Sequence, residues 1–330
     1  MSAWFLLNMM GYHDNLSYGV SMFEKILVPL DGSDLAEVAL PYAEELMRRL
    51  HSQLVLLCVC TANETQEQLL YLEQAAEKIG HRAQRYREKN PGVMIDDPYV
   101  ETVVLNGKTS EEIIDYVEAN QIALTIMATH GRSGISRWAM GSVADKVIRG
   151  INRPVCLIRA RGSHAEVRPD CLVSRIFAPL DGSEAGEAAL PYIEALAERL
   201  STEVVLFQSV PKDDRSEDVT WVELEKLAKR SAKIYLRKVE GTLASKGIAA
   251  RSEVEFGGNP AQEIIHLAER TRSAVVAMST HGRTGVDRLM FGSVAEKVLR
   301  AGTTPLFLVR APGADMPRST SYGSRCTVSY

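Results

Sequence analysis

The strongest constraint on the fold is an internal duplication. The segment KILVPLDGSDLAEVALPYAEELMRRL at 25–50 returns as RIFAPLDGSEAGEAALPYIEALAERL at 175–200. Asp31 in the first copy therefore corresponds to Asp181 in the second, a separation of 150 residues. Solenoid repeats have periods of roughly 20–50 residues, so a period of this length indicates two whole domains in tandem.

Each copy alternates apolar runs with amphipathic segments of helical periodicity. The expected strands are 25–30, 53–60, 98–105, 123–129 and 154–159 in the first copy and 175–180, 203–210, 250–256, 274–280 and 305–310 in the second. A helix is expected between successive strands, and Pro41 and Pro191 should kink or shorten the first helix of each copy. This alternation predicts an α/β protein with two tandem Rossmann-like domains, each an open five-stranded parallel sheet with helices on both faces.

Changes in composition set the domain boundaries. Residues 1–21 form an N-terminal extension, 22–160 the first domain and 173–311 the second. The polar segment 161–172 is the expected linker, and the Ser- and Gly-rich segment 312–330 is expected to be a flexible tail. A chain of 330 residues is long enough to form two cores of this size.

The charge balance excludes several classes of partner. The net charge of −4 and the pI near 6.0 argue against non-specific nucleic-acid binding, and no long basic run predicts a membrane-surface helix. The apolar patch at 4–10 has no basic residue before it and no small-residue cleavage site after it. We therefore expect no export signal, and Met22 is an alternative start.

The five cysteines fit a reduced, cytoplasmic protein better than a disulfide framework. Cys58 and Cys60 lie in the apolar run LVLLCVC, where alternation places both side chains on one face of a strand. No cluster of Cys or His residues stands nearby to complete a zinc site. Burial in the core is therefore the expected role of these thiols, and no metal site is predicted.

A glycine-rich loop follows the fourth expected strand of each copy. It reads THGRSGISRWAMGS at 129–142 and THGRTGVDRLMFGS at 280–293, directly before a helix. Glycines allow the backbone to approach an anion closely, and a helix N-terminus offers free N–H groups and the positive end of its dipole. The DGS turn after the first strand should lie at the same edge, because open α/β sheets bind ligands at the carboxyl ends of their strands.

These features outline a nucleotide site in each copy. Asp31 is placed to accept hydrogen bonds from ribose hydroxyls or the base. The expected phosphate-binding residues are Gly131, Gly134, Gly141 and Ser142, with Arg132 or Arg137 to neutralise charge. In the second copy they are Gly282, Gly285, Gly292 and Ser293, with Asp181 after the first strand.

A simpler interpretation of the same helix starts needs no ligand. Ser142 and Asp145 fit the capping-box pattern, in which the serine caps the helix and an acid three residues later reaches back. Ser293 and Glu296 fit it in the second copy.

The spacing of the loop residues resembles that of the universal stress protein family. ATP-binding members of this family carry the motif G-x2-G-x9-G-[ST] between the fourth strand and the last helix. Gly131, Gly141 and Ser142 match its last three fixed positions, but the first glycine falls on Ala128. The second copy matches in the same way and has Ser279 at that first position.

The resemblance covers both halves and implies an adenine nucleotide α-hydrolase-like fold that binds ATP, with or without Mg²⁺. The residues that it implies in the first half are Pro29, Leu30, Asp31, Val59, Ala128, Thr129, His130, Gly131, Arg132, Gly134, Gly141, Ser142 and Val143. In the second half they are Pro179, Leu180, Asp181, Ser209, Ser279, Thr280, His281, Gly282, Arg283, Gly285, Gly292, Ser293 and Val294. Val59 and Ser209 would lie near the adenine, and the serine makes the second pocket more polar.

The function that the resemblance implies is regulatory or protective rather than catalytic: a cytoplasmic, ATP-binding protein of the stress response. Domains of this family commonly pair through their last strands. We therefore expect 154–159 and 305–310 to pair within one chain as an intramolecular pseudo-dimer, which would cover strand edges. A homodimer of whole chains is left open.

Two further function classes remain as alternatives: a nucleotide-using enzyme and a ligand-free protein. An adenylylating ligase would need a Ser-Gly-Gly-x-Asp-Ser loop or a His-x-Gly-His motif, and neither occurs. His130 and His281 could serve as bases in slow ATP hydrolysis, but neither half offers an obvious nucleophile or carboxylate cluster. The other alternative is a ligand-free tandem interaction module, because Ala128 and Ser279 replace the first glycine of the motif.

Overall fold

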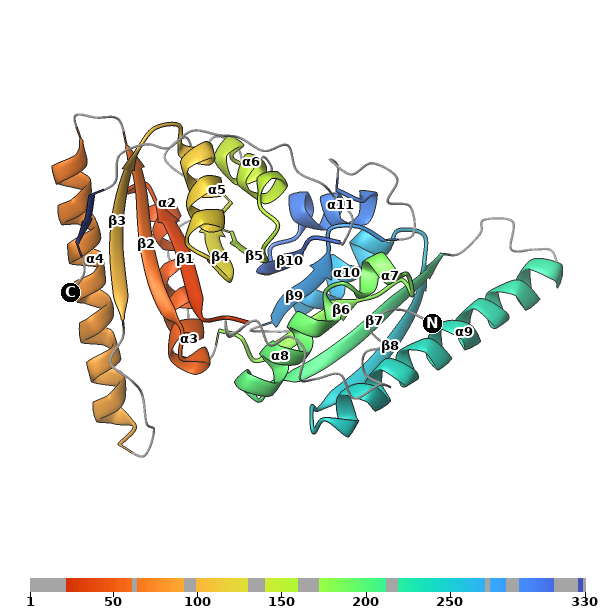
Figure 1. Cartoon of the computed structure of the whole chain (residues 1–330). Helices are drawn as coiled ribbons and strands as arrows, with labels where there is room; N and C mark the ends of the chain where they lie inside the picture. The colour runs from red at the N-terminus through yellow and green to blue at the C-terminus, as the bar shows by residue number, and fades with distance from the viewer. Residues whose placement is uncertain are drawn as a thin grey trace. The chain divides into compact units, whose positions relative to one another are not determined.

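The structure is a computed structural model of the chain, and the elements that it describes are drawn in Figure 1. The described residues are 22–60, 64–91, 99–129, 140–159, 172–211, 219–270, 274–282, 291–311 and 326–328. The chain splits into two compact units between Leu172 and Val173. We call the described residues before this point, together with 326–328, the first domain, and residues 173–311 the second domain.

The first domain is an open parallel sheet with helical crossovers, as predicted. Its elements are β1 (Lys25–Leu30), α2 (Asp34–Glu37), α3 (Leu40–Leu50), β2 (Gln53–Cys60), α4 (Thr65–Lys89), β3 (Val100–Asn106), α5 (Thr109–Ala119), β4 (Leu124–Ala128), α6 (Ser142–Gly150) and β5 (Val155–Ile158). The strand order is β3-β2-β1-β4-β5, with every neighbouring pair parallel. The short strand β11 (Cys326–Val328) pairs antiparallel with β3.

The second domain repeats this architecture. Its elements are β6 (Arg175–Pro179), α7 (Glu184–Glu187), α8 (Leu190–Leu200), β7 (Glu203–Pro211), α9 (Val219–Ser245), β8 (Ala250–Gly257), α10 (Pro260–Arg270), β9 (Ala274–Ser279), α11 (Ser293–Ala301) and β10 (Leu306–Val309). The strand order is β8-β7-β6-β9-β10, again parallel throughout. The predicted fold class is therefore confirmed in both domains.

Apolar burial on both faces explains why these strands lie at the centre of each domain. Successive residues of β2, β4 and β5 are buried, although neighbouring side chains of a strand point to opposite faces. Leu27, Leu56 and Ile126 have no exposed surface. Each such side chain contributes about 1.5–3 kcal/mol when fully buried, so helices must cover the sheet on both sides.

The prolines divide the first helical segment of each domain, as the sequence predicts. Pro41 lies in the first turn of α3 and Pro191 in the first turn of α8, where the missing N–H costs no intrahelical bond. The short helices α2 and α7 end just before these turns. Their N-caps, Ser33 and Ser183, each accept a backbone N–H on the side-chain oxygen.

The strand order creates one topological switch point in each domain. β1 lies between β2 and β4, and β6 lies between β7 and β9. Chain connections leave the sheet in opposite directions at such a point, and open α/β sheets bind their ligands there, outside the carboxyl ends of the central strands. The DGS turns and the starts of the glycine-rich loops follow these strand ends.

Candidate functional site

The aspartate after the first strand of each domain is held by its own turn. Asp31 Oδ1 accepts hydrogen bonds from Ser33 N at 3.0 Å and from Ser33 Oγ at 2.6 Å. Asp181 Oδ1 makes the same two bonds to Ser183, at 3.0 and 2.6 Å. The intervening glycine has a φ of 78° in both domains, a backbone conformation that strongly favours glycine. Each carboxylate is thereby fixed at the switch point.

In the second domain, Asp181 directly faces the glycine-rich loop. A Cβ atom added to Gly282 would lie 2.3 Å from Asp181 Oδ2, so only a glycine allows this approach. A Cβ atom on Gly186 would lie 2.4 Å from the other carboxylate oxygen. The sequence predicted both Asp181 and Gly282 as site residues, and the structure brings them together from β6 and β9.

The glycine-rich loop begins and ends at one hydrogen bond in each domain. Gly141 N donates to Thr129 O at 2.8 Å, and Gly292 N donates to Thr280 O at 2.9 Å. The threonine N–H groups donate in turn to the last strand, Thr129 to Ile158 O at 2.9 Å and Thr280 to Val309 O at 2.8 Å. The loop ends are thus anchored to the sheet edge, and the last helix of each domain starts beside the end of the fourth strand.

The capping-box expectation is wrong for both of these helices. The N-caps are Gly141 and Gly292, and neither helix has a side-chain cap hydrogen bond. Ser142 and Ser293 are instead the first helical residues, with exposed side chains. A glycine N-cap has no side chain to satisfy the free N–H groups of the first turn, so these groups remain available to an anion.

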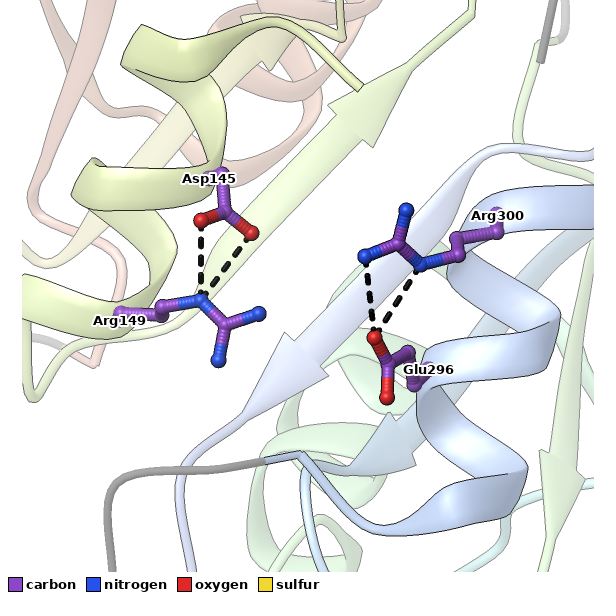
Figure 2. A network of polar contacts seen from close by, with 4 residues as sticks. All are labelled: Asp145, Arg149, Glu296 and Arg300. Atoms are coloured by element: carbon purple, nitrogen blue, oxygen red, sulfur yellow. Dashed lines mark hydrogen bonds and ion pairs between the residues drawn. The ribbon is translucent and has the colours of Figure 1, made fainter. Parts of the chain in front are cut away.

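The acids of the expected capping boxes also point elsewhere. Asp145 pairs with Arg149 at 3.0 Å and Glu296 pairs with Arg300 at 3.0 Å, each within its own helix (Figure 2). Both are i,i+4 pairs, which stabilise an exposed helix by about 0.2–0.5 kcal/mol. Because each acid is engaged by an arginine in the following turn, it does not reach back to the N-cap.

The second domain carries polar atoms without hydrogen-bond partners at this edge. Ser209 Oγ, near the end of β7, and His281 Nε2 are buried and make no hydrogen bond. The other ring nitrogen of His281, Nδ1, lies 3.0 Å from Thr280 Oγ1. A buried unsatisfied polar atom costs about 1–3 kcal/mol, so these two atoms favour a polar ligand at the site.

Ser279, which replaces the first glycine of the family motif, has a structural role. It is buried, and its Oγ accepts the His281 N–H at 3.3 Å. This bond fixes the first residues of the second loop. Ala128, its counterpart in the first domain, is buried at the end of β4 and has no side-chain polar atom.

The remaining predicted residues fall into two groups. Those at strand and helix ends lie at the expected edge, namely Pro29, Leu30 and Val59 with Pro179 and Leu180, and Val143 and Val294 in the first turns of α6 and α11. The others lie outside the described residues, namely His130, Gly131, Arg132, Gly134 and Arg137, with Arg283 and Gly285. Their roles stay predictions.

One pair beside the first-domain site was not predicted. Tyr71, on α4, donates a hydrogen bond to Glu37 Oε1 at 2.9 Å. The pKa of Tyr71 is raised, mainly by burial, then by the bond to Glu37 and by the charges of Glu37 and Asp31. The raised pKa keeps the tyrosine protonated, so it stays a hydrogen-bond donor to Glu37 at neutral pH. A tyrosine occurs in both LLYL at 69–72 and KIYL at 233–236, which was the available signal.

The chemistry of the described residues suits a ligand that carries an anionic group and hydroxyl groups. A glycine-capped helix start suits a phosphate, and a fixed aspartate suits ribose hydroxyls. Within the described residues, no group of three or more His, Cys, Asp and Glu side chains could hold a metal ion. Mg²⁺ at such a site would be bound largely by phosphate oxygens and water. In the same part of the chain, no helix has the length and apolar character needed to cross a bilayer.

Comparisons with known proteins agree with the duplication. A family model described as the Universal stress protein family matches residues 22–159 and 173–310. A universal stress protein of Methanocaldococcus jannaschii is 29% identical over 144 residues, which cover 43% of this chain and 84% of the relative. One from Bacillus subtilis is 28% identical over 162 residues, covering 42% of this chain and 100% of the relative. One from Mycobacterium tuberculosis is 26% identical over 197 residues, covering 58% of this chain and 63% of the relative.

Solved structures resemble the chain in fold. A universal stress protein from Archaeoglobus fulgidus has a TM-score of 0.57 at 18% identity and covers 87% of this chain and 98% of its own. A functionally unknown protein from Pseudomonas aeruginosa has a TM-score of 0.59 at 17% identity and covers 88% of this chain and 93% of its own. Both likenesses extend over most of the chain and concern the fold alone.

Proposed function

This chain belongs to the universal stress protein family, whose model matches it twice, and we propose that each of its domains binds one ATP molecule. The nucleotide would lie across the switch point, with its ribose at Asp31 or Asp181 and its phosphates at the start of α6 or α11. Its occupancy would regulate which partners the protein engages under stress.

One observation carries the proposal. In the second domain, Asp181 follows β6 and Gly282 follows β9, and a Cβ atom added to Gly282 would lie 2.3 Å from Asp181 Oδ2. The close approach excludes every side chain at Gly282. A loop that binds no ligand would not need so strict a requirement for glycine. The glycine N-cap of α11 then supplies the anion site that a nucleotide phosphate needs.

A binding role is favoured over a catalytic one by the described residues. Nδ1 of His281 lies beside Thr280 Oγ1 rather than beside a carboxylate, so no acid orients it as a general base. A cytoplasmic location fits Cys58, Cys60 and Cys156, which are free and buried. Burial raises the pKa of Cys156 to about 12, so its thiol is unreactive. The intramolecular pairing of the last strands stays a prediction.

The test is the ATP stoichiometry of matched glycine variants. Acid extraction and chromatography identify any nucleotide that copurifies, and titration calorimetry then compares wild type with Gly141→Val and Gly292→Val. A Cβ at residue 292 would already lie 3.4 Å from Thr280 O, and the branches of valine extend further toward the loop. We expect two sites in wild type, one in each variant and none in the double variant.

Gly258→Val is the matched control, because a Cβ there meets nothing within 4 Å. It should retain both sites. If wild type copurified with no nucleotide and showed no heat of ATP binding, the proposal would be rejected in favour of a ligand-free interaction module. Phosphate release by the loaded wild type, lost on substitution of His281, would instead favour the slow ATPase.

A further inference from the structure

The long helices α4 and α9 cover equivalent strands but begin at different points. Leu72 and Leu236 are both fully buried and both follow a tyrosine, which aligns the two helices. Two ion pairs support this alignment independently. Arg82 pairs with Glu44 in the first domain, and Lys246 pairs with Glu194 in the second.

On this alignment the second helix has an extension at its N-terminus. The shift from Leu72 to Leu236 is 164 residues, so Thr65, the first residue of α4, corresponds to Lys229. α9 starts at Val219, ten residues earlier. In Figure 1 this end of α9 reaches beyond the strands that the rest of the helix covers. The extension, 219–228, therefore has no counterpart in the first domain.

Residues 222–228 of the extension contribute no side chain to the buried core of their domain. The buried face of α9 consists of Ala232, Leu236, Val239 and Leu243, which all lie after it. Between residues 222 and 231 every side chain except Glu225 is exposed. A solvated helix end of this length is marginal without packing, because most helix stability in proteins comes from a buried face.

An apolar stripe nevertheless runs along the exposed side. It consists of Leu224, Leu227 and Ile234, with the small Ser231 between them, and their spacing of i, i+3, i+7 and i+10 places all four on one face of the helix. The leucines are 48% and 60% exposed and the isoleucine 69%. Such a row of large apolar side chains on a charged helix is typical of an interaction surface.

The charges along one edge of the stripe select its partner. Glu223, Arg230 and Arg237 recur every seven residues, so they form one row beside the stripe. If two copies of α9 packed in parallel, the two rows would lie on opposite sides of the contact, and each would face Ala228 and Tyr235 of the second copy rather than a charge. An antiparallel pair instead places Glu223 opposite Arg237 of the second copy, twice per pair. The antiparallel pair also brings Arg230 opposite its own counterpart, so two opposite-charge pairs flank one contact between like charges.

We propose that the apolar stripe of α9 is a dimerisation surface, on which the same stripe of a second copy of this chain packs antiparallel. The contact is isologous, so it closes as a two-fold dimer and leaves no free surface for further growth. It buries the leucines that the extension otherwise exposes. The extension therefore serves assembly, and it is independent of nucleotide binding.

The primary test is the mass of the full chain in solution. Sedimentation velocity over a concentration series should show a reversible dimer for wild type. Leu227→Glu places a charge at the centre of the contact, and we expect it to raise the dimer dissociation constant at least a hundredfold. Leu70→Glu is the matched control. Leu70 is the first-domain counterpart of Ile234 and is 55% exposed, but it lies on the helix without the extension.

A charge swap tests the orientation. Glu223→Arg or Arg237→Glu alone should weaken the dimer about tenfold, because each brings like charges together in the antiparallel pair. The double variant should restore wild-type affinity. Ser231→Cys should in addition give a disulfide-linked dimer under oxidation that wild type does not form.

Three results would overturn the proposal. A monomer at every concentration would exclude the dimer, whether the stripe is solvated or covered by another segment of the chain. A dimer that Leu227→Glu leaves intact would place the contact elsewhere. A dimer that the double charge swap fails to restore would reject antiparallel packing. Because the substituted residues are exposed, unchanged thermal unfolding and unchanged ATP stoichiometry serve as folding controls.

Discussion

The two candidate sites share a backbone frame but differ in the side chains that line it. In both domains an aspartate is fixed by a serine two residues later, and a glycine N–H closes the loop onto a threonine carbonyl. The first domain then places Val59 and Ala128 at this edge, whereas the second places Ser209 and Ser279. The hydrogen bonds that set the main chain are the same in the two copies, and the side chains beside them have diverged. We therefore expect two sites of the same architecture and unequal affinity.

The largest effect is expected when the close approach in the second domain is broken. In Gly282→Ala the new methyl group would meet Asp181 Oδ2 at 2.3 Å, so the carboxylate must move away from the ligand edge. A hydrogen bond to a charged group contributes about 1.5–3 kcal/mol, which corresponds to roughly a tenfold to hundredfold loss of ATP affinity at the second site. Titration calorimetry should show the first site unchanged.

Gly258→Ala is the control for this substitution, since it adds a methyl group in open space. Equal ATP affinity of the Gly282→Ala protein and wild type at the second site would mean that Asp181 does not hold the nucleotide.

A smaller effect is expected from exchanging the strand residues near the proposed adenine. Ser209→Val removes a buried hydroxyl without a partner, so the ligand-free second domain should gain about 1 kcal/mol in the free energy of unfolding. The same change should weaken ATP binding there, because the hydroxyl is then lost to the ligand. Urea unfolding without nucleotide and calorimetry with ATP measure the two quantities.

Val59→Ser is the reciprocal variant and should lower the stability of the first domain by about 1–2 kcal/mol. If Ser209→Val raised stability and left ATP affinity unaltered, the hydroxyl would have no part in binding, and the two sites would differ for another reason.

The smallest effects should come from the long helices, where each copy has an interior glycine with free space. A methyl group added to Gly80 in α4 or to Gly241 in α9 would meet nothing within 4 Å. Each change to alanine should raise the free energy of unfolding by about 0.5–1 kcal/mol, because alanine loses less backbone entropy in a helix. Chemical denaturation of each variant measures this gain.

Gly247→Ala should change the free energy of unfolding in the opposite direction. Gly247 also lies in open space, but its φ of 77° is in the left-handed region, so alanine there should destabilise. A destabilised Gly241→Ala protein would show that α9 needs flexibility at that turn.

The sequence predicted the fold well because its strands are apolar and continuous. β2 has the predicted bounds, and Pro41 divides its segment as expected. The sequence did not show that α9 begins ten residues before the point equivalent to the start of α4. Both segments are charged and amphipathic, and only the burial of Leu72 and Leu236 shows how they align.

The site was predicted in outline, and the errors in it have a common cause. The capping boxes failed because the N-cap position depends on the path of the loop, which a hydrogen bond from Gly141 to Thr129 determines. Sequence spacing alone does not contain that information. Tyr71 was missed because its partner, Glu37, is 34 residues away and belongs to a different helix.

The uncapped start of α6 and α11 has a consequence for the lifetime of the protein. With no side chain on the first-turn N–H groups, the folded state without ligand lacks a bond that the proposed nucleotide would supply. A ligand that binds only the folded state stabilises it by about 2.7 kcal/mol at a hundred times its dissociation constant. Degradation by cellular proteases follows the small unfolded fraction, so a fall in ATP would shorten the half-life of the chain. The abundance of the protein would then report the energy supply of the cell without any change in gene expression.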